Sequence, residues 1–220
     1  GIRAVMEAIE AGKDIDKVYI KKDLHGDLIN ELNELIRLHG IVTQRVPVER
    51  INKITRKNHQ GVVAVLSAVT YHSLDNIVPQ LYEDGVLPFI VVLDGITDVR
   101  NFGAIARTCE CAGVDAIVIP ERGSVSVGGD AVKTSAGALL HIPVCRERSA
   151  ASAVRFLKDN GYTVVAASEK ADINYTMADY TVPVAIVMGA EDVGLSPEVM
   201  KLCDTFVSIS QFGHIGSLNV

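Results

Sequence analysis

The side chains best suited to chemistry lie in a turn at residues 94–107, which reads DGITDVRNFGAIAR. The turn brings a carboxylate, an amide and a guanidinium close together, from Asp94, Asn101 and Arg107. It follows the apolar run FIVVL at residues 89–93, which is typical of a strand buried on both faces of a mainly parallel sheet. Because open α/β sheets bind ligands at the carboxyl ends of their strands, we expect the active site here.

Two further loops follow predicted strands and are also rich in glycine. Residues 187–197 read VMGAEDVGLSP, so that Gly189 and Gly194 bracket Glu191 ahead of a helix that we expect Ser196 to cap and Pro197 to open. Residues 209–219 read ISQFGHIGSLN. Glycine allows the backbone to approach a ligand closely, so the three loops together predict a pocket built largely from backbone groups.

Nucleotide and metal sites of the common kinds are not predicted. The chain contains neither G-x-G-x-x-G after a strand nor G-x-x-x-x-G-K-[ST]. The GSVSVGG run at residues 123–129 lacks the lysine of a P-loop and is interpreted either as a mobile loop over the pocket or simply as a loop. The histidines are scattered, and we expect His141 and His214 to make ordinary hydrogen bonds.

Charge is distributed unevenly along the chain. The net charge of −6 argues against a nucleic-acid partner, but residues 1–70 carry 11 Lys and Arg against 9 Asp and Glu, while residues 71–220 carry 10 against 18. A basic cluster over residues 45–57 is followed directly by Asn58, His59 and Gln60. Such a cluster can bind phosphates even on an acidic protein, although it can also be an ordinary solvated face.

The four cysteines lack the spacing of zinc ligands, and no apolar run is long enough for a membrane span. Together with the absence of a secretory pattern, this predicts a cytoplasmic protein with reduced cysteines and no contact with a membrane.

Hydrophobic periodicity predicts two α/β domains. Alternating helices and strands describe a small domain at residues 1–70, and residues 71–87 are interpreted as a linker with a short helix from Ser73. A larger domain at residues 88–220 has predicted strands near 89–93, 115–119, 163–167, 183–188 and 205–209, and predicted helices near 101–112, 130–139, 149–160 and 196–203.

Three stretches of the larger domain, NFGAIART, MGAEDVGLSPEV and SISQFGHIGSLNV, resemble the three motifs of the SpoU/TrmH family of RNA ribose 2′-O-methyltransferases. GIRAVMEAI and NHQGVVA in the smaller domain resemble that family's ribosomal-protein-like RNA-binding module. The pairing is most similar to the bacterial enzymes that methylate a guanosine ribose in 23S rRNA, so rRNA or a ribosome precursor is the expected partner.

The resemblance implies a trefoil-knotted α/β methyltransferase domain, S-adenosylmethionine as cofactor, and a homodimer in which the partner subunit helps to complete each site. It also implies roles for individual residues. The expected cofactor-binding residues are Gly189, Ile209 and Leu218, and the expected catalytic and site-shaping residues are Asn101, Arg107, Glu191, Ser217 and Asn219. The candidates for RNA contact are Arg56, Lys57, Asn58, His59 and Gln60.

Two departures from the family pattern stand out. Ser210 occupies a position where the family usually has proline. The sequence also stops at Val220, where the family's last helix begins, and that helix threads the knot and walls the cofactor pocket. Either the protein continues beyond Val220, which we favour, or the chain as given binds the cofactor poorly.

Arg107 is the residue expected to act on the ribose hydroxyl. As a literal base it would have to be neutral at pH 7, which costs roughly 7–8 kcal/mol because an arginine side chain loses its proton only at strongly alkaline pH. We therefore expect a cation that orients the RNA phosphate and stabilises a developing alkoxide, while the proton leaves through phosphate or water.

The other residues have simpler interpretations as well. Asn101 could cap a helix that starts at Phe102, Glu191 could be a carboxylate favoured by a helix N-terminus, and Ser217 and Asn219 could cap the missing helix. Methylation of tRNA, or an RNA-binding protein without activity on the same scaffold, remain the alternatives for function.

Overall fold

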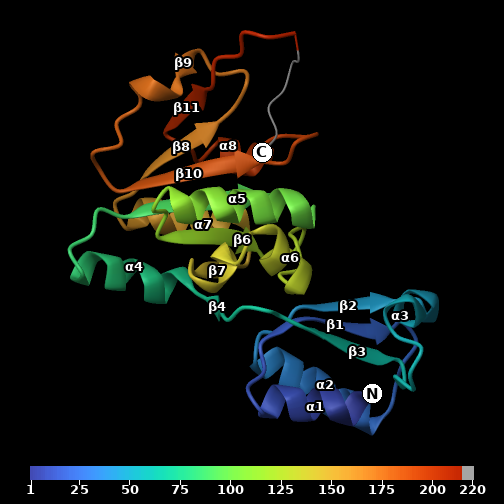
Figure 1. The fold of residues 1–220 in the computed structure, drawn as a ribbon. Coiled ribbons are helices and arrows are strands. Elements are labelled where there is room, and N and C mark those ends of the chain that lie inside the picture. The colour runs from blue at the N-terminus through green and yellow to red at the C-terminus, as the bar shows by residue number, and fades with distance from the viewer. Residues whose placement is uncertain (215–220) are drawn as a thin grey trace. The chain divides into compact units, whose positions relative to one another are not determined.

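The computed structural model describes residues 1–214, which divide into two compact units. Unit 1 comprises residues 1–70 together with 126–128, and unit 2 comprises the remaining residues. Figure 1 shows the elements of both units, coloured along the chain. Within residues 1–214, no helix combines the length and the apolar character needed to cross a membrane.

Unit 1 is a three-stranded sheet with two helices packed on it. The strands β1 (Ile15–Lys21), β2 (Thr43–Val46) and β3 (Val62–Leu66) are arranged in the order β2-β1-β3, with β1 parallel to β2 and antiparallel to β3. The amphipathic helices α1 (Ile2–Glu10) and α2 (Asp27–Leu38) bury Val5, Ile9, Ile29 and Leu32 against strand residues such as Val18 and Ile20. The short helix α3 (Val48–Ile54) begins after Pro47, which occupies its N-cap.

Unit 2 is organised around an eight-stranded sheet in which every pairing is parallel. Its order is β4-β7-β6-β5-β10-β8-β11-β9. The strands are β4 (Tyr71–His72), β5 (Phe89–Asp94), β6 (Ala116–Pro120), β7 (Val144–Glu147), β8 (Thr163–Ala167), β9 (Ile173–Asn174), β10 (Val184–Gly189) and β11 (Thr205–Ser208).

Helices cover both faces of this sheet, and Figure 1 shows α5 in front of it and α7 behind. The α-helices are α4 (Leu74–Glu83), α5 (Val99–Cys111), α6 (Gly129–Thr134), α7 (Ala150–Asp159) and α8 (Pro197–Met200). Two short 3-10 helices complete the unit, η1 (Ala138–Leu140) and η2 (Tyr175–Met177). The largest core cluster packs α4, α7 and α8 against β5 and its neighbours, through residues such as Val78, Ile90, Val92, Leu157 and Val199.

The prediction of an α/β protein with a mainly parallel sheet is confirmed. Residues 71–87, interpreted as a linker, form β4 and α4, and both elements belong to unit 2. Leu74 and Val78 of α4 are buried in the main core, because they fall on the same face of the helix. The trefoil knot implied by the resemblance depends on residues beyond 214, which lie outside the described part of the chain.

Candidate active site and RNA-binding surface

The first and second loops leave the same edge of the sheet. Asp94 ends β5 and Gly189 ends β10, and the two residues are register partners in the parallel pair. The chain runs from β5 to β6 and β7 on one side, whereas β8 and β11 lie beyond β10 on the other. The boundary between β5 and β10 is therefore a topological switch point, where open α/β sheets bind their ligands.

Helix α5 is fixed at its start by a residue that the sequence analysis did not single out. Asp98 is the N-cap, and its Oδ1 accepts hydrogen bonds from the backbone N–H groups of Arg100 and Asn101, both at 2.9 Å. The backbone N–H of Asn101 is the main cause that lowers the pKa of Asp98. The interpretation that Asn101 caps a helix beginning at Phe102 is thus wrong, because the helix begins at Val99 with Asp98 as its cap.

Since Asp98 provides the cap, the Asn101 side chain is available for another contact. Its Nδ2 donates to Oε2 of Glu191 at 3.2 Å, across 90 residues of sequence. This bond joins two of the predicted catalytic residues, one from each of the first two motifs. An amide that donates to a carboxylate fixes the orientation of both groups, and it leaves the amide oxygen and the second carboxylate oxygen to accept hydrogen bonds.

The second loop closes on itself through its backbone. Ala190 and Gly194 exchange two hydrogen bonds, of 3.2 and 2.8 Å, and Gly194 has a positive φ of 69°. A Cβ on Gly189 would lie 2.3 Å from the carbonyl carbon of Gly194, so Gly189 is needed for this closure. Beyond the loop, the backbone N–H of Ser196 donates to Oδ2 of Asp94 at 2.7 Å, which ties the second loop to the first.

Ser196 is the N-cap of α8 and Pro197 the first helical residue, as expected. The Ser196 side chain makes no capping bond, however, and its contribution is the backbone bond to Asp94. The helix is shorter than predicted, since it ends at Met200.

Arg107 lies on α5, six residues beyond Asn101, and is exposed to solvent. Within residues 1–214 its guanidinium has no hydrogen bond or ion pair to another side chain. The structure therefore brings Asn101 and Glu191 into contact but does not join Arg107 to them. A free guanidinium on this helix is available for an anionic ligand.

The third loop is described only in part. Ile209 follows β11 and is 50% exposed, while Ser217, Leu218 and Asn219 lie outside the described residues. Ser210, which departs from the family pattern, accepts a hydrogen bond from Nδ2 of Asn174 at 2.8 Å. This bond connects the start of the third loop to the end of β9.

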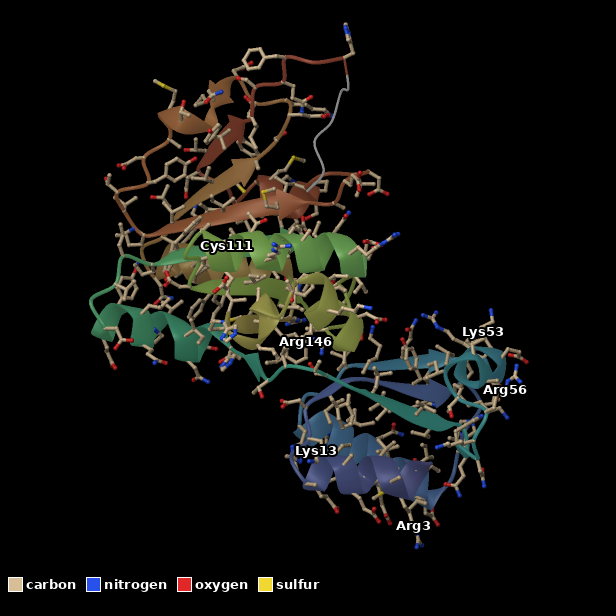
Figure 2. All side chains as sticks on the ribbon, viewed as in Figure 1. Arg3, Lys13, Lys53, Arg56, Cys111 and Arg146 are labelled. Carbon is tan, nitrogen blue, oxygen red and sulfur yellow. The ribbon has the colours of Figure 1, made fainter. Side chains whose placement is uncertain are left out.

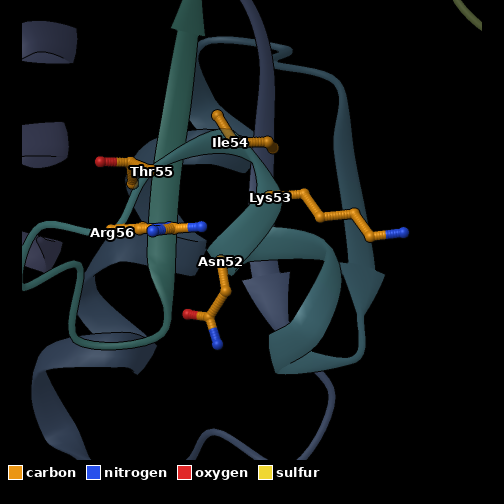
Figure 3. A pocket seen from close by; sticks show the side chains of 5 residues that line it. All are labelled: Asn52, Lys53, Ile54, Thr55 and Arg56. Carbon is orange, nitrogen blue, oxygen red and sulfur yellow. The ribbon is translucent and has the colours of Figure 1, made fainter.

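The basic cluster of unit 1 surrounds the end of α3. Figure 2 labels Lys53 and Arg56 on this part of the unit. Asn52, Lys53, Ile54, Thr55 and Arg56 line an open hollow of about 750 Å³. Figure 3 shows their side chains spreading in different directions from this short segment. The exposed apolar side chain of Ile54 lies among the cations, and such a combination suits a base next to its phosphate.

The five predicted RNA-contact residues differ in their exposure and in whether their side chains already form hydrogen bonds within the protein. Arg56, Lys57 and Asn58 are exposed. Nδ1 of His59 accepts from the N–H of Gly61 at 3.0 Å, so its Nε2 carries the hydrogen and donates to Oδ1 of Asn52 at 2.8 Å.

The side chain of Gln60 also forms a hydrogen bond within unit 1, since its Oε1 accepts from the N–H of Ile2 at 3.3 Å. His59 and Gln60 thus both have a structural role, which their position in a polar sequence run does not reveal.

The loop at residues 123–129, interpreted from the sequence as a mobile loop over the pocket or simply a loop, contributes residues to both units. Its residues 126–128 cluster with unit 1, where Val127 O accepts a hydrogen bond from Ala68 N at 2.8 Å.

Comparison with known proteins agrees with this arrangement. Residues 88–220 match the SpoU rRNA Methylase family, and residues 1–72 match the family described as RNA 2′-O ribose methyltransferase substrate binding. A Staphylococcus saprophyticus protein assigned to the TrmH family of tRNA/rRNA methyltransferases is 37% identical over 219 residues, which cover 100% of this chain and 88% of that protein.

Two solved structures share the fold over the whole chain. The AdoMet-bound rRNA methyltransferase from Sinorhizobium meliloti is 27% identical with a TM-score of 0.61, and 80% of it is covered. The SpoU methyltransferase AviRb from Streptomyces viridochromogenes, in complex with AdoMet, is 23% identical with a TM-score of 0.60, and 82% of it is covered. With a methylase match over more than half of its length, a substrate-binding match over residues 1–72 and a relative at 37% identity, the chain belongs to the SpoU rRNA methylase family of RNA methyltransferases.

Proposed function

We propose that the protein transfers a methyl group from S-adenosylmethionine to the ribose 2′-hydroxyl of a guanosine in 23S rRNA. The observation that carries this proposal is the bond between Asn101 and Glu191 at the switch point of a SpoU-type sheet. The substrate-binding match over residues 1–72, whose description names RNA 2′-O ribose methyltransferases, supports the ribose position.

The residues around the second loop fit the cofactor. The backbone of the closed turn at residues 189–194 offers polar groups beside Gly189, and the half-exposed Ile209 offers an apolar surface. The exposed Glu191 carboxylate favours a sulfonium cation nearby. Gly189, Ile209 and Leu218 would hold S-adenosylmethionine, which supplies an electrophilic methyl group when bound.

Arg107 and the Asn101–Glu191 pair would act on the RNA. The Arg107 guanidinium is a cation with a fork of N–H donors, so it would bind a phosphate and stabilise negative charge that develops on the 2′-oxygen. The Asn101–Glu191 pair would orient the ribose through the acceptors that its mutual bond leaves open. The 2′-proton would pass to phosphate or water, and Ser217 and Asn219 would shape the same site.

Unit 1 would recruit the RNA through the surface at the end of α3. Its exposed cations Lys53, Arg56 and Lys57 would bind the backbone, and Asn58 would contact an unpaired base. We further propose that two copies of the chain assemble as a homodimer, which light scattering after size-exclusion chromatography would test.

The experiment is a methyl-transfer assay with S-[methyl-³H]adenosylmethionine on transcribed 23S rRNA and, separately, on a tRNA pool. Ribose 2′-O-methylation protects the 3′-phosphodiester from alkaline cleavage, so the modified position can be mapped. Incorporation at a guanosine of 23S rRNA is expected. Incorporation into tRNA alone would show that the substrate is tRNA and not 23S rRNA. If calorimetry detects no heat on addition of S-adenosylmethionine, the protein would be an RNA-binding protein without methyltransferase activity.

A further inference from the structure

A second hollow lies entirely within unit 2, on the same carboxyl edge of the sheet as the candidate active site. Its volume is about 370 Å³, and its polar lining consists of Asp94, Arg122, Arg148, Ser149, Ser196 and Glu198. None of Asn101, Arg107, Gly189 and Glu191 lines it. The volume falls within the range of about 300–1,000 Å³ that is usual for small-ligand sites, so it can accept more than a single ion.

Two arginines from neighbouring strand ends face this hollow. Arg122 follows β6 and Arg148 follows β7, and these strands are parallel and paired up to Pro120 and Glu147. Both arginines are exposed, and neither has a hydrogen bond or ion pair to another residue among 1–214. Two uncommitted guanidinium groups on one cavity wall are suited to a phosphate, because each presents parallel N–H donors to the anion's oxygens.

The acidic groups of the hollow are already engaged. Asp94 Oδ2 accepts from the Ser196 N–H at 2.7 Å. Glu198 Oε1 accepts from Arg155 Nη2 at 3.3 Å. Glu198 is paired with the cation Arg155, whereas Asp94 keeps its negative charge because a neutral N–H does not cancel it. Arg122, Arg148 and Arg155 together therefore outweigh the two carboxylates by one positive charge.

The glutamates next to the arginines in sequence, Glu121 and Glu147, do not line the hollow. Glu147 Oε1 instead accepts from the N–H of Leu74 at 2.9 Å. Neither residue therefore places a carboxylate in the wall that the two arginines share.

Two residues that line the hollow also connect it to the candidate active site through a hydrogen bond. Asp94 and Ser196 both line it, and their hydrogen bond joins the loop that carries Asn101 to the loop that carries Glu191. A nucleotide held by Arg122 and Arg148 would therefore rest against the segments that position the Asn101–Glu191 pair.

We propose that this hollow binds a nucleotide of the RNA strand next to the one that is methylated, with its backbone phosphate between Arg122 and Arg148. This inference rests on the proposed function, since it takes RNA as the substrate. It assigns unit 2 a phosphate contact of its own, in addition to the basic surface of unit 1.

The test compares the double variant Arg122→Ala/Arg148→Ala with wild type and with Arg3→Ala/Arg37→Ala. The control removes two exposed arginines from α1 and α2, so both variants lose the same charge. Binding is measured by fluorescence anisotropy with a labelled 20-nucleotide single-stranded RNA and with transcribed 23S rRNA. Affinity for S-adenosylmethionine is measured by calorimetry, and folding by the thermal midpoint.

The Arg122/Arg148 variant should bind RNA about 10-fold more weakly than the control at 0.1 M salt, because two charge-assisted contacts are lost. Its slope of log affinity against log salt should fall by about 0.7, as expected for one lost phosphate contact. Its affinity for S-adenosylmethionine and its thermal midpoint should match those of wild type.

Equal RNA affinities and salt slopes for the two double variants would overturn the inference. A loss of cofactor affinity with unchanged RNA binding would also overturn it, since the hollow would then serve the cofactor. Wild-type protein that binds both RNAs but transfers no methyl group would refute the proposed activity, while the anisotropy comparison would still decide the role of the hollow.

Discussion

Asn101 Nδ2 and Glu191 Oε2 lie 3.2 Å apart, and their hydrogen bond directly links side chains of the first and second motif loops. Two supports make this contact possible. Asp98 caps α5 and fixes the backbone of Asn101, while Asp94 binds the backbone of Ser196 behind the loop of Glu191. Asp98 and Asp94 thus each accept a backbone N–H hydrogen bond that fixes one of the two loops carrying the pair.

The first prediction concerns this pair. Asn101→Ala and Glu191→Ala should each lower the turnover of methyl transfer, and the double variant should be little worse than either, because each residue orients the other. A double-mutant cycle on turnover should give a coupling of about 1 kcal/mol, the usual net value of an intramolecular hydrogen bond. Fully additive losses would show that the two residues act independently.

The second prediction concerns Arg107, which has no protein partner within residues 1–214. Arg107→Ala should reduce turnover by about 10²–10³-fold, as for loss of a group that stabilises developing charge, while S-adenosylmethionine still binds. Arg107→Lys keeps the charge but loses the fork of donors, so it should retain part of the activity. Loss of cofactor affinity in calorimetry would instead assign Arg107 a structural role.

The central strands of unit 2 could be predicted because their sequences are almost entirely apolar. Residues 90–93 are buried and residues 184–189 are buried or partly buried in a parallel sheet, and such strands are continuous hydrophobic runs. A shared pocket for the first two loops followed from the same reasoning, because both loops leave the carboxyl ends of strands. The contact between Asn101 and Glu191 itself was not predicted, since it depends on β5 and β10 being neighbours in the sheet.

The edge strand β4 and its neighbour β7 could not be predicted in this way. β7 reads VCRE, and β4 has only two residues, so neither presents an apolar run. The cap at Asp98 was missed because Asn101 is an equally good capping residue, and the register of the helix start decides between them. The pattern Asp-x-x-Asn ahead of the small residues of α5 is the signal that could have identified Asp98.

The third prediction concerns the two glycines of the second loop. Gly189→Ala would place a Cβ 2.3 Å from the Gly194 backbone, so it should cost about 1–3 kcal/mol or more and weaken cofactor binding as the loop is displaced. Gly194→Ala meets nothing within 4 Å and should cost only about 1–2 kcal/mol, for its left-handed φ of 69°. Urea denaturation of both variants provides the comparison. A Gly189→Ala protein as stable as wild type would contradict the tight closure.

The fourth prediction separates structure from recognition in unit 1. His59→Ala removes bonds to Asn52 and Gly61, so it should lower the free energy of unfolding by about 1–2 kcal/mol. Asn58→Ala, at the exposed neighbouring position, should leave stability unchanged and weaken RNA binding. Urea denaturation and RNA anisotropy on both variants test this division. If the His59→Ala protein is as stable as wild type but binds RNA more weakly, His59 contacts RNA and does not stabilise unit 1.

The fifth prediction is a pH dependence that arises at Asp98. The backbone N–H of Asn101 is the main cause that lowers the pKa of this carboxylate in the folded state, below its value in the unfolded chain. The ionised cap therefore adds stability that is fully present above the unfolded pKa and is lost as the pH falls through the folded pKa.

Asp98→Asn keeps a capping oxygen but cannot titrate, so it is the matched comparison. Thermal midpoints measured at low salt between pH 6 and pH 3 should show an advantage of wild type over Asp98→Asn near pH 6. That advantage should shrink below about pH 4, as the wild-type carboxylate becomes protonated. Since Asp98 is exposed, added salt should reduce the advantage at pH 6 as well. A difference between the two proteins that stays constant over this pH range would mean that the charge of Asp98 does not stabilise the start of α5, and that Asn101 is positioned by the hydrogen-bond geometry of the cap alone.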